Sequence, residues 1–294
     1  AALLTSPSSR FLPQQILGVW ATHLTDAVCT AANHKFRTIL FGCKRGEIAT
    51  YHLDDVNGAL VCAYRTSLRV KDGSELISRL GCVNHIECSP HGSAFAAVWS
   101  PLKTQQNESL RPLAPVLGIF TSFGAQLWSS LESSTDRELN IEVVYKWVDW
   151  GPEGFSLWLG SNCGLSVLPV SRSIAVANPN MEHLDRIVFV SSSRVYVSPA
   201  KDKEQSASAP HNVWRIFNIP NDYLSSNWPI RLVTIDRERN QWILVAGTRG
   251  FTHCNMLTER WRLFGNETQE KDMLVTGGLA IWNGFAVISC YDIN

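Results

Sequence analysis

The sequence lacks an excess of either charge, and this excludes one broad way of selecting a partner. Its 294 residues carry 26 basic and 26 acidic side chains, so the formal net charge is zero. A protein that is drawn to nucleic acid or to an anionic membrane by its overall field needs a basic surplus. Charge therefore predicts no nucleic-acid partner and no direct membrane binding.

The sequence also lacks the local motifs of common catalytic sites. It contains no Gly-x-x-x-x-Gly-Lys phosphate loop, no Gly-x-Gly-x-x-Gly, no Gly-x-Ser-x-Gly elbow and no His-Glu-x-x-His. The acidic pair Asp54-Asp55 lies beside Asn57-Gly58, where a solvated turn is expected rather than an acid/base pair. We therefore predict no catalytic residues, no cofactor and no covalent chemistry.

No Cys-x-x-Cys motif occurs among the 8 cysteines, and their scatter is typical of reduced thiols packed as small apolar side chains. One set has ligand types at three-residue intervals: Cys82, His85, Cys88 and His91. Because a three-residue step along a strand changes face, these four side chains converge poorly. We interpret them as ordinary strand and turn residues and keep a zinc site as the minor alternative.

Uninterrupted apolar runs are missing as well. Residues 273–291 carry no charge, but Asn283-Gly284 divides them and is a strong hairpin signal, so two buried strands are expected. Residues 112–131 are likewise uncharged and are broken by Pro115 and by glycines. The first residues lack a methionine, a basic segment and an apolar segment, so no signal peptide is visible. The missing start and the abrupt end at residues 292–294 favour a piece of a longer protein.

What the sequence does contain is a dense series of short strands. Between residues 230 and 264, four apolar segments are separated by charged or glycine-containing turns: 230–235, 242–246, 251–256 and 261–264. The second is apolar throughout, as in a strand buried on both faces. One four-stranded antiparallel sheet within about 40 residues is the unit of a β-propeller blade.

The same unit recurs along the chain. Gly46, Gly124, Gly164 and Gly250 each lie between two apolar segments, and the gaps between them are 78, 40 and 86 residues. These gaps are close to two, one and two periods of about 40 residues, the length of a propeller blade. The pattern predicts five fairly complete blades and the start of a sixth at Met273, with strands in about half of the chain and little helix.

We therefore predict an all-β fold, a WD-repeat-like β-propeller. Residues 1–80 are expected to form one or more blades at the end of a first propeller or at its junction, and residues 81–294 further blades. Polar inserts near 100–112 and 201–210 interrupt the second part and are expected to be mobile and dispensable.

Several segments, in order along nearly the whole chain, resemble the ribosome-control-protein (Ric) family. The most specific are YLSSNWPIR at 223–231, VAGTRGFTHCNMLTERWRLFGNETQE at 245–270 and MLVTGGLAIWNGFAVISCYDIN at 273–294. Earlier pieces are SSRFLPQQILGVW, AANHKFRTILFGCKRGEI, SPHGSAFAAVW and FTSFGAQLW. The two polar inserts depart from the family pattern.

The family supplies the large β-propeller subunit of a two-subunit guanine-nucleotide-exchange factor for a Golgi Rab GTPase. The resemblance implies a cytosolic protein, attached peripherally to Golgi membranes through its complex, with a smaller arrestin-like partner subunit and a Rab-family GTPase as partners. It also implies an interior fragment spanning parts of two propellers. The predicted five and a half blades agree better with such a fragment than with one closed seven-bladed ring. A self-contained scaffold propeller, such as a coat or ubiquitin-ligase adaptor, is the alternative; a propeller hydrolase ranks below both.

Two segments beside the best blade, 222–231 and 264–272, do not follow a strand pattern. They hold the candidate partner-binding residues Tyr223, Trp228, Arg231, Glu267 and Glu270. In one interpretation both aromatic side chains fill the gap between blades and the charged run is solvated. In the other, one edge of the blade contacts the partner subunit or the GTPase, with Trp228 as the buried anchor and Arg231 as its polar neighbour.

Overall fold

The computed structural model describes residues 2–5, 16–19, 21, 23–54, 56, 58–69, 80–100, 115–131, 145–178, 186–199, 214–236 and 241–292. It divides into two compact units, Ala1–Leu168 and Pro169–Asn294, which are described separately here. Apart from Ser100, the two predicted polar inserts lie outside the described residues. The boundary expected at residue 80 stays a prediction.

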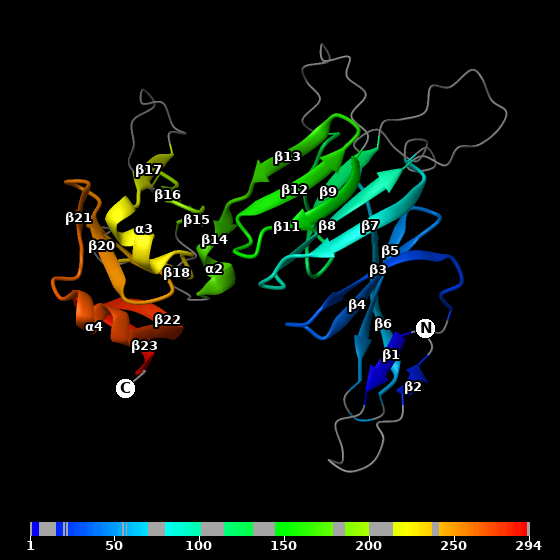
Figure 1. Cartoon of the computed structure of the whole chain (residues 1–294), viewed down its shortest axis with the longest axis horizontal. Coiled ribbons are helices and arrows are strands. Elements are labelled where there is room, and N and C mark those ends of the chain that lie inside the picture. Colours follow the sequence, from blue (N-terminus) through cyan, green and yellow to red (C-terminus); the bar gives the residue numbers. More distant parts are fainter. Residues whose placement is uncertain are drawn as a thin grey trace, which may run out of the picture. The chain divides into compact units, whose positions relative to one another are not determined.

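The first unit consists of antiparallel sheets formed by consecutive strands (Figure 1). Two of them have four strands: β3 (Ala27–Asn33), β4 (Thr38–Cys43), β5 (Glu47–Leu53) and β6 (Leu60–Ser67), then β7 (Cys82–Cys88), β8 (Ala94–Ser100), β9 (Val116–Thr121) and β10 (Gln126–Ser129). A three-stranded sheet follows, made of β11 (Tyr145–Trp150), β12 (Ser156–Ser161) and β13 (Gly164–Pro169). A two-stranded sheet, β1 (Ala2–Thr5) and β2 (Ile16–Val19), precedes them.

Successive sheets of this unit pack face to face through apolar side chains. Phe95 and Phe120 stack with ring centroids 5.2 Å apart, and both belong to a buried cluster that Leu40 and Ile48 of the preceding sheet complete. The Trp99 indole N–H in this cluster donates to the Gly46 carbonyl oxygen at 2.9 Å. These two four-stranded sheets therefore bury apolar faces against each other, as propeller blades do.

The second unit contains two more four-stranded sheets and one hairpin (Figure 1). The first sheet is β14 (Arg172–Ser173), β15 (Val188–Val190), β16 (Arg194–Val197) and β17 (Arg215–Asn218); the second is β18 (Leu232–Ile235), β19 (Trp242–Ala246), β20 (Phe251–Asn255) and β21 (Arg260–Arg262). The hairpin is β22 (Met273–Trp282) and β23 (Phe285–Asp292). Three short helices lie between these strands: α2 (Ile174–Ala177), α3 (Asn221–Asn227) and α4 (Glu267–Asp272).

The strand predictions agree with this topology. The four strands expected between 230 and 264 form one antiparallel sheet, β18–β21, and the apolar segment 242–246 coincides with β19, which is buried from Ile243 onward. The four glycines that mark the repeat all have positive φ. The all-β propeller fold is confirmed, and the last hairpin begins at Met273 as expected.

The turn between β22 and β23 is also as predicted, but the burial of these strands is not. Asn283 and Gly284 have φ of 48° and 79°, the positive pair that a tight I′ hairpin turn requires. Only one face of the hairpin packs: Val275 and Leu279 lie against Leu244 in a buried cluster. The other face is open, and Trp282 and Phe285 are 65% and 68% exposed. Among the described residues of the hairpin, only Val275 and Leu279 are buried and none is on β23, so the prediction of two buried strands is wrong.

One side-chain amide connects the beginning of this unit to its end. Asn178, which follows α2 and is buried, donates from Nδ2 to the Leu279 carbonyl oxygen at 2.7 Å. The Leu279 N–H donates back to the Asn178 Oδ1 at 3.4 Å. The Asn178 amide thus forms with β22 the two hydrogen bonds that a residue of a neighbouring strand would form. No helix in the described part of the chain is long and apolar enough to cross a membrane.

Candidate functional site

The segments 222–231 and 264–272, which do not follow a strand pattern, contain the short helices α3 and α4. Both helices contact the loop 247–250 between β19 and β20. The Gly247 N–H donates to the Tyr223 hydroxyl at 2.8 Å, and the Thr248 N–H donates to the Asn227 carbonyl oxygen at 2.7 Å. The Gly250 N–H donates to the Met273 carbonyl oxygen at 2.9 Å. We call α3, α4 and this loop the α3–α4 site.

Two glycines of the loop allow this close approach. A Cβ at Gly247 would overlap the Asn227 carbonyl oxygen and lie 2.8 Å from its carbon. A Cβ at Gly250, which has φ +57°, would overlap the Glu270 side chain. The sequence Gly-Thr-Arg-Gly therefore does more than form a turn: its first glycine allows α3 to approach the loop, and its last glycine allows α4 to approach it.

Tyr223 belongs to the core of the site. Its side chain is 2% exposed, and besides accepting from Gly247 its hydroxyl lies 3.3 Å from the Gly250 carbonyl oxygen. Burial raises the pKa of this hydroxyl well above its ordinary value, so it stays neutral and able to donate. Tyr223 thus holds α3 on the blade, and it has no surface to offer a partner.

Trp228 and Arg231 lie on the outside. Trp228 directly follows α3 and is 45% exposed, while its carbonyl oxygen accepts from the Thr248 hydroxyl at 3.0 Å. The Arg231 N–H donates to the Ala246 carbonyl oxygen at 2.9 Å, and its side chain is exposed. Trp228 is thus far more exposed than Tyr223, and the interpretation that it fills a gap between blades stays a prediction. Its backbone is nevertheless fixed at both ends.

Glu270 is tied to the site from the other side. Its Oε1 accepts from the Asn227 Nδ2 at 3.2 Å, which joins α4 to α3. The Asn266 side chain begins α4 by accepting from the Thr268 and Gln269 N–H groups, a normal N-cap. Glu267 is the first residue of α4, but its side chain lies outside the described residues. The role of these residues in partner binding stays a prediction.

Asn227 is the residue of this site that sequence reasoning missed. It is 2% exposed and bonds through its carbonyl oxygen to the loop and through its amide to Glu270. The available signal was an asparagine at the end of a short polar segment, immediately before Trp228-Pro229. That signal alone does not separate a helix end from an ordinary turn.

The two histidines of the alternative zinc set contact the following sheet. His85 Nε2 lies 3.0 Å from the Val148 carbonyl oxygen on β11, and His91 Nε2 lies 3.0 Å from the Glu153 carbonyl oxygen in the following turn. Burial raises the pKa of the Cys88 thiol to about 12, which keeps it protonated. Within the described ranges, no three His, Cys, Asp or Glu side chains are grouped as metal ligands.

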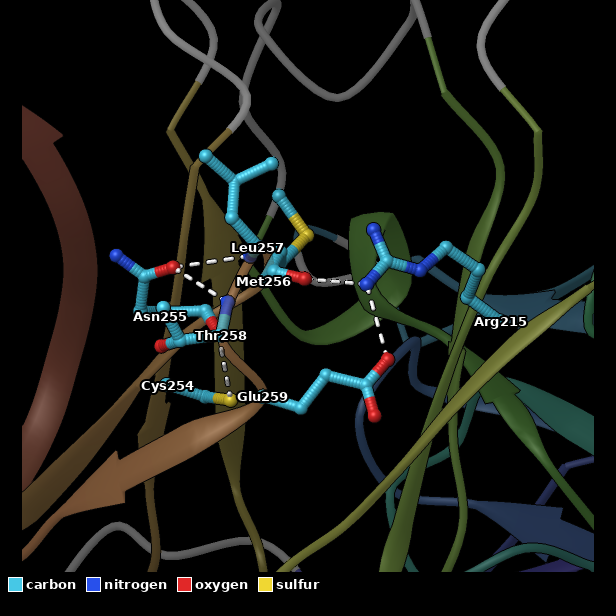
Figure 2. Close-up of polar contacts among 7 residues, drawn as sticks. All are labelled: Arg215, Cys254, Asn255, Met256, Leu257, Thr258 and Glu259. Carbon is cyan, nitrogen blue, oxygen red and sulfur yellow. Dashed lines mark hydrogen bonds and ion pairs between the residues drawn. The ribbon is translucent and has the colours of Figure 1, made fainter.

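In the second unit, another polar cluster joins β17 to the turn between β20 and β21 (Figure 2). The Arg215 guanidinium donates to the Met256 carbonyl oxygen and pairs with Glu259 Oε1 at 3.1 Å. The Asn255 Oδ1 organises this turn by accepting from the Leu257 and Thr258 N–H groups. Since both ionic partners are largely exposed, the pair orients the turn and adds little stability.

Comparisons with known proteins relate the sequence of this chain to one family. Residues 191–294, which include the whole α3–α4 site, match the model described as the RIC1 second beta propeller domain. A guanine nucleotide exchange factor subunit of Caenorhabditis elegans is 45% identical over 96% of this chain. By both matches the chain is similar to the Ric family. The Ric relatives named guanine nucleotide exchange factor subunit RIC1 in human and mouse are 29% and 30% identical over 99% of this chain.

The chain spans about a fifth of the length of these Ric relatives: 19% of the worm protein and 23% of each mammalian one. What the whole relatives do is therefore a property of much longer proteins.

Proposed function

We propose that this chain forms part of the propeller portion of a guanine-nucleotide-exchange-factor subunit and acts by binding rather than by covalent chemistry. The observation that carries the proposal is the similarity, over almost the whole chain, to relatives named as subunits of such a factor. The propeller fold is compatible with the role, because stacked blades present large rigid surfaces to partners.

The proposal includes specific partners that rest on the resemblance of the sequence to the Ric family. The substrate is a Rab-family GTPase of Golgi retrograde vesicle traffic, and the second subunit is a smaller arrestin-like protein. The protein is then cytoplasmic and peripheral on Golgi membranes through its complex. In this role it needs no cofactor.

Exchange by binding has a simple energetic basis. A factor that binds the nucleotide-free GTPase more tightly than the nucleotide-bound form weakens nucleotide affinity by the same factor, because the two binding events are linked. The chain must therefore hold one conformation of the GTPase, or hold the second subunit that does so. A rigid contact surface suits this task, since little ordering entropy is lost on binding.

We assign the contact to the exposed part of the α3–α4 site. Trp228 is a large aromatic side chain, 45% exposed, on a backbone that hydrogen bonds fix from both sides. Arg231 is exposed beside it in the sequence, and Trp and Arg are the residue types that dominate binding energy at interfaces. Glu267 and Glu270 on α4 are the acidic members of this predicted surface.

The test combines copurification with nucleotide exchange. The full-length subunit is purified with its partner, and release of a fluorescent GDP analogue from the Rab GTPase is measured for Trp228→Ala and Arg231→Glu. Trp158→Ala is the matched control, because Trp158 is 39% exposed and lies in the other unit. We expect Trp228→Ala to weaken assembly or exchange by about tenfold or more, with thermal stability nearly unchanged.

Unchanged assembly and exchange in a folded Trp228→Ala variant would show that this surface is not the contact. Failure to recover an arrestin-like subunit or a Rab GTPase, with coat or ubiquitin-ligase subunits in their place, would favour the scaffold alternative. Glu270→Lys is less informative, because Glu270 also bonds Asn227 and its loss disturbs the fold.

A further inference from the structure

The unit 169–294 contains a small pocket between the sheet β18–β21 and the tip of the hairpin β22–β23. It encloses about 170 Å³. The lining comes from both elements: Trp242, Leu244, Phe251, His253, Ile281, Gly284 and Ala286. All but one of these side chains are apolar, and the pocket is separate from the α3–α4 site.

The chemistry of the sheet changes in one direction across the pocket. Leu244 on β19 pairs with His253 on β20, which pairs with Arg262 on β21. Directly opposed residues of antiparallel strands project to the same face, so the row runs from an apolar side chain through an imidazole to a guanidinium. The next row runs from Trp242 through the amide of Asn255 to the guanidinium of Arg260.

The imidazole in the middle of the row is held neutral. Burial, and next the nearby charge of Arg262, lower the pKa of His253 below its ordinary value. The floor of the pocket is therefore uncharged at neutral pH, and positive charge is confined to the β21 side.

The two arginines at that side are available to a ligand. Both are exposed, and within the described ranges neither forms an ion pair with a carboxylate. The carboxylate of Glu259, which precedes Arg260 in the sequence, forms its ion pair with Arg215 instead (Figure 2). β21 is also the last strand of its sheet, so its outer edge is unpaired in the described structure.

We propose that this pocket binds a linear peptide segment of a partner protein, with one large apolar side chain in the pocket and an acidic residue beside it facing Arg262. The size fits one side chain, since a protein cavity of about 150 Å³ accommodates benzene. The acidic neighbour follows from charge complementarity with the basic rim. A lipid acyl chain needs a longer apolar channel than this pocket provides. The proposal is independent of the exchange role.

A selection experiment gives a direct answer. A phage library of random dodecapeptides is selected on the full chain and, in parallel, on Ala286→Phe, which fills the pocket from the exposed β23 strand. Val287→Phe is the matched control, because the neighbouring residue of a strand points to the opposite face. We expect peptides with an aromatic or large aliphatic residue next to Asp or Glu on the wild type and on Val287→Phe, and their loss on Ala286→Phe.

The enriched peptides are then synthesised with a fluorescent label and measured by fluorescence polarisation. Replacing the apolar anchor by Ala is expected to reduce affinity more than tenfold. Replacing the acidic residue by its amide, or Arg262→Gln in the protein, is expected to reduce it about threefold, and the two changes together by no more than either alone. Arg194→Gln, an exposed arginine on β16, is the control for charge and is expected to have no effect.

The proposal is overturned if the wild type and Ala286→Phe enrich the same peptides, or if the enriched peptides lack an acidic neighbour. The proposal is also overturned, in favour of a lipid surface, by a second combination of results. In it, the selection enriches no peptide motif, and the wild type, but not folded Ala286→Phe, binds phosphatidylcholine–phosphatidylserine vesicles. Melting temperatures of all variants establish that each is folded.

Discussion

Replacing Gly247 with alanine is expected to separate α3 from the blade that it covers. The new methyl group would overlap the Asn227 carbonyl oxygen, and the obstacle is backbone rather than a flexible side chain. Relief requires a shift of the end of α3, which lengthens two hydrogen bonds, from Thr248 N–H to Asn227 and from Gly247 N–H to Tyr223. Each such bond is worth about 1 kcal/mol, and forced overpacking costs about 1–3 kcal/mol, so we expect a loss of about 3–5 kcal/mol.

That loss is a large part of the 5–15 kcal/mol or so that stabilises a typical domain. Urea denaturation followed by tryptophan fluorescence measures it directly. Gly265→Ala is the matched control, because a Cβ there meets nothing within 4 Å and the residue is exposed. The control should change stability by about 0.5 kcal/mol or less. A loss of less than about 1 kcal/mol for Gly247→Ala would refute the argument that this contact is too close to yield.

Three further results are expected. Tyr223→Phe removes the acceptor of the buried Gly247 N–H and should cost about 1–3 kcal/mol in the same urea experiment; a neutral effect would contradict this role. His253 has a lowered pKa in the folded chain, so the unfolded chain binds more protons just below the ordinary histidine pKa of about 6.5, and stability should fall on acidification through that range. The melting temperature of the wild type should therefore drop more from neutral to mildly acidic pH than that of His253→Gln. Parallel curves of melting temperature against pH for the two proteins would contradict the lowered pKa of His253. Alkylation by iodoacetamide at neutral pH, followed by mass spectrometry, should modify the exposed Cys62, Cys163 and Cys290 first. Cys29, Cys43 and Cys254 should react later, because burial raises their pKa values to about 11. Simultaneous modification of all six would contradict this burial.

The sequence was sufficient for the strands because their signals are local. The segment 242–246 is apolar throughout and became a buried central strand, and Asn283-Gly284 requires the positive φ values of one turn type. Such signals depend on a few neighbouring residues, so they survive without knowledge of the rest of the fold.

The helices and the burial of individual aromatic residues could not be predicted in the same way. The α3 segment, Asn221–Asn227, is too short to show helical periodicity, and its stability comes from contacts with the loop 247–250. Tyr223 and Trp228 look equivalent in the sequence, yet one is 2% and the other 45% exposed. What separates them is the position of a loop about 20 residues further along the chain, which no local pattern contains.

The contact between Asn178 and Leu279 has a consequence for how the second unit unfolds. In repeat architectures each element contacts mainly its neighbours, so one end can fray while the rest persists. Here two residues 101 positions apart are joined by a buried pair of hydrogen bonds. Detaching β22 leaves the buried Asn178 amide without its hydrogen-bond partner. Conversely, the ordered Asn178 side chain adds little stability until β22 is in place. The two ends of the unit are therefore expected to exchange their amide protons together, at a rate set by opening of the whole unit rather than of a single sheet.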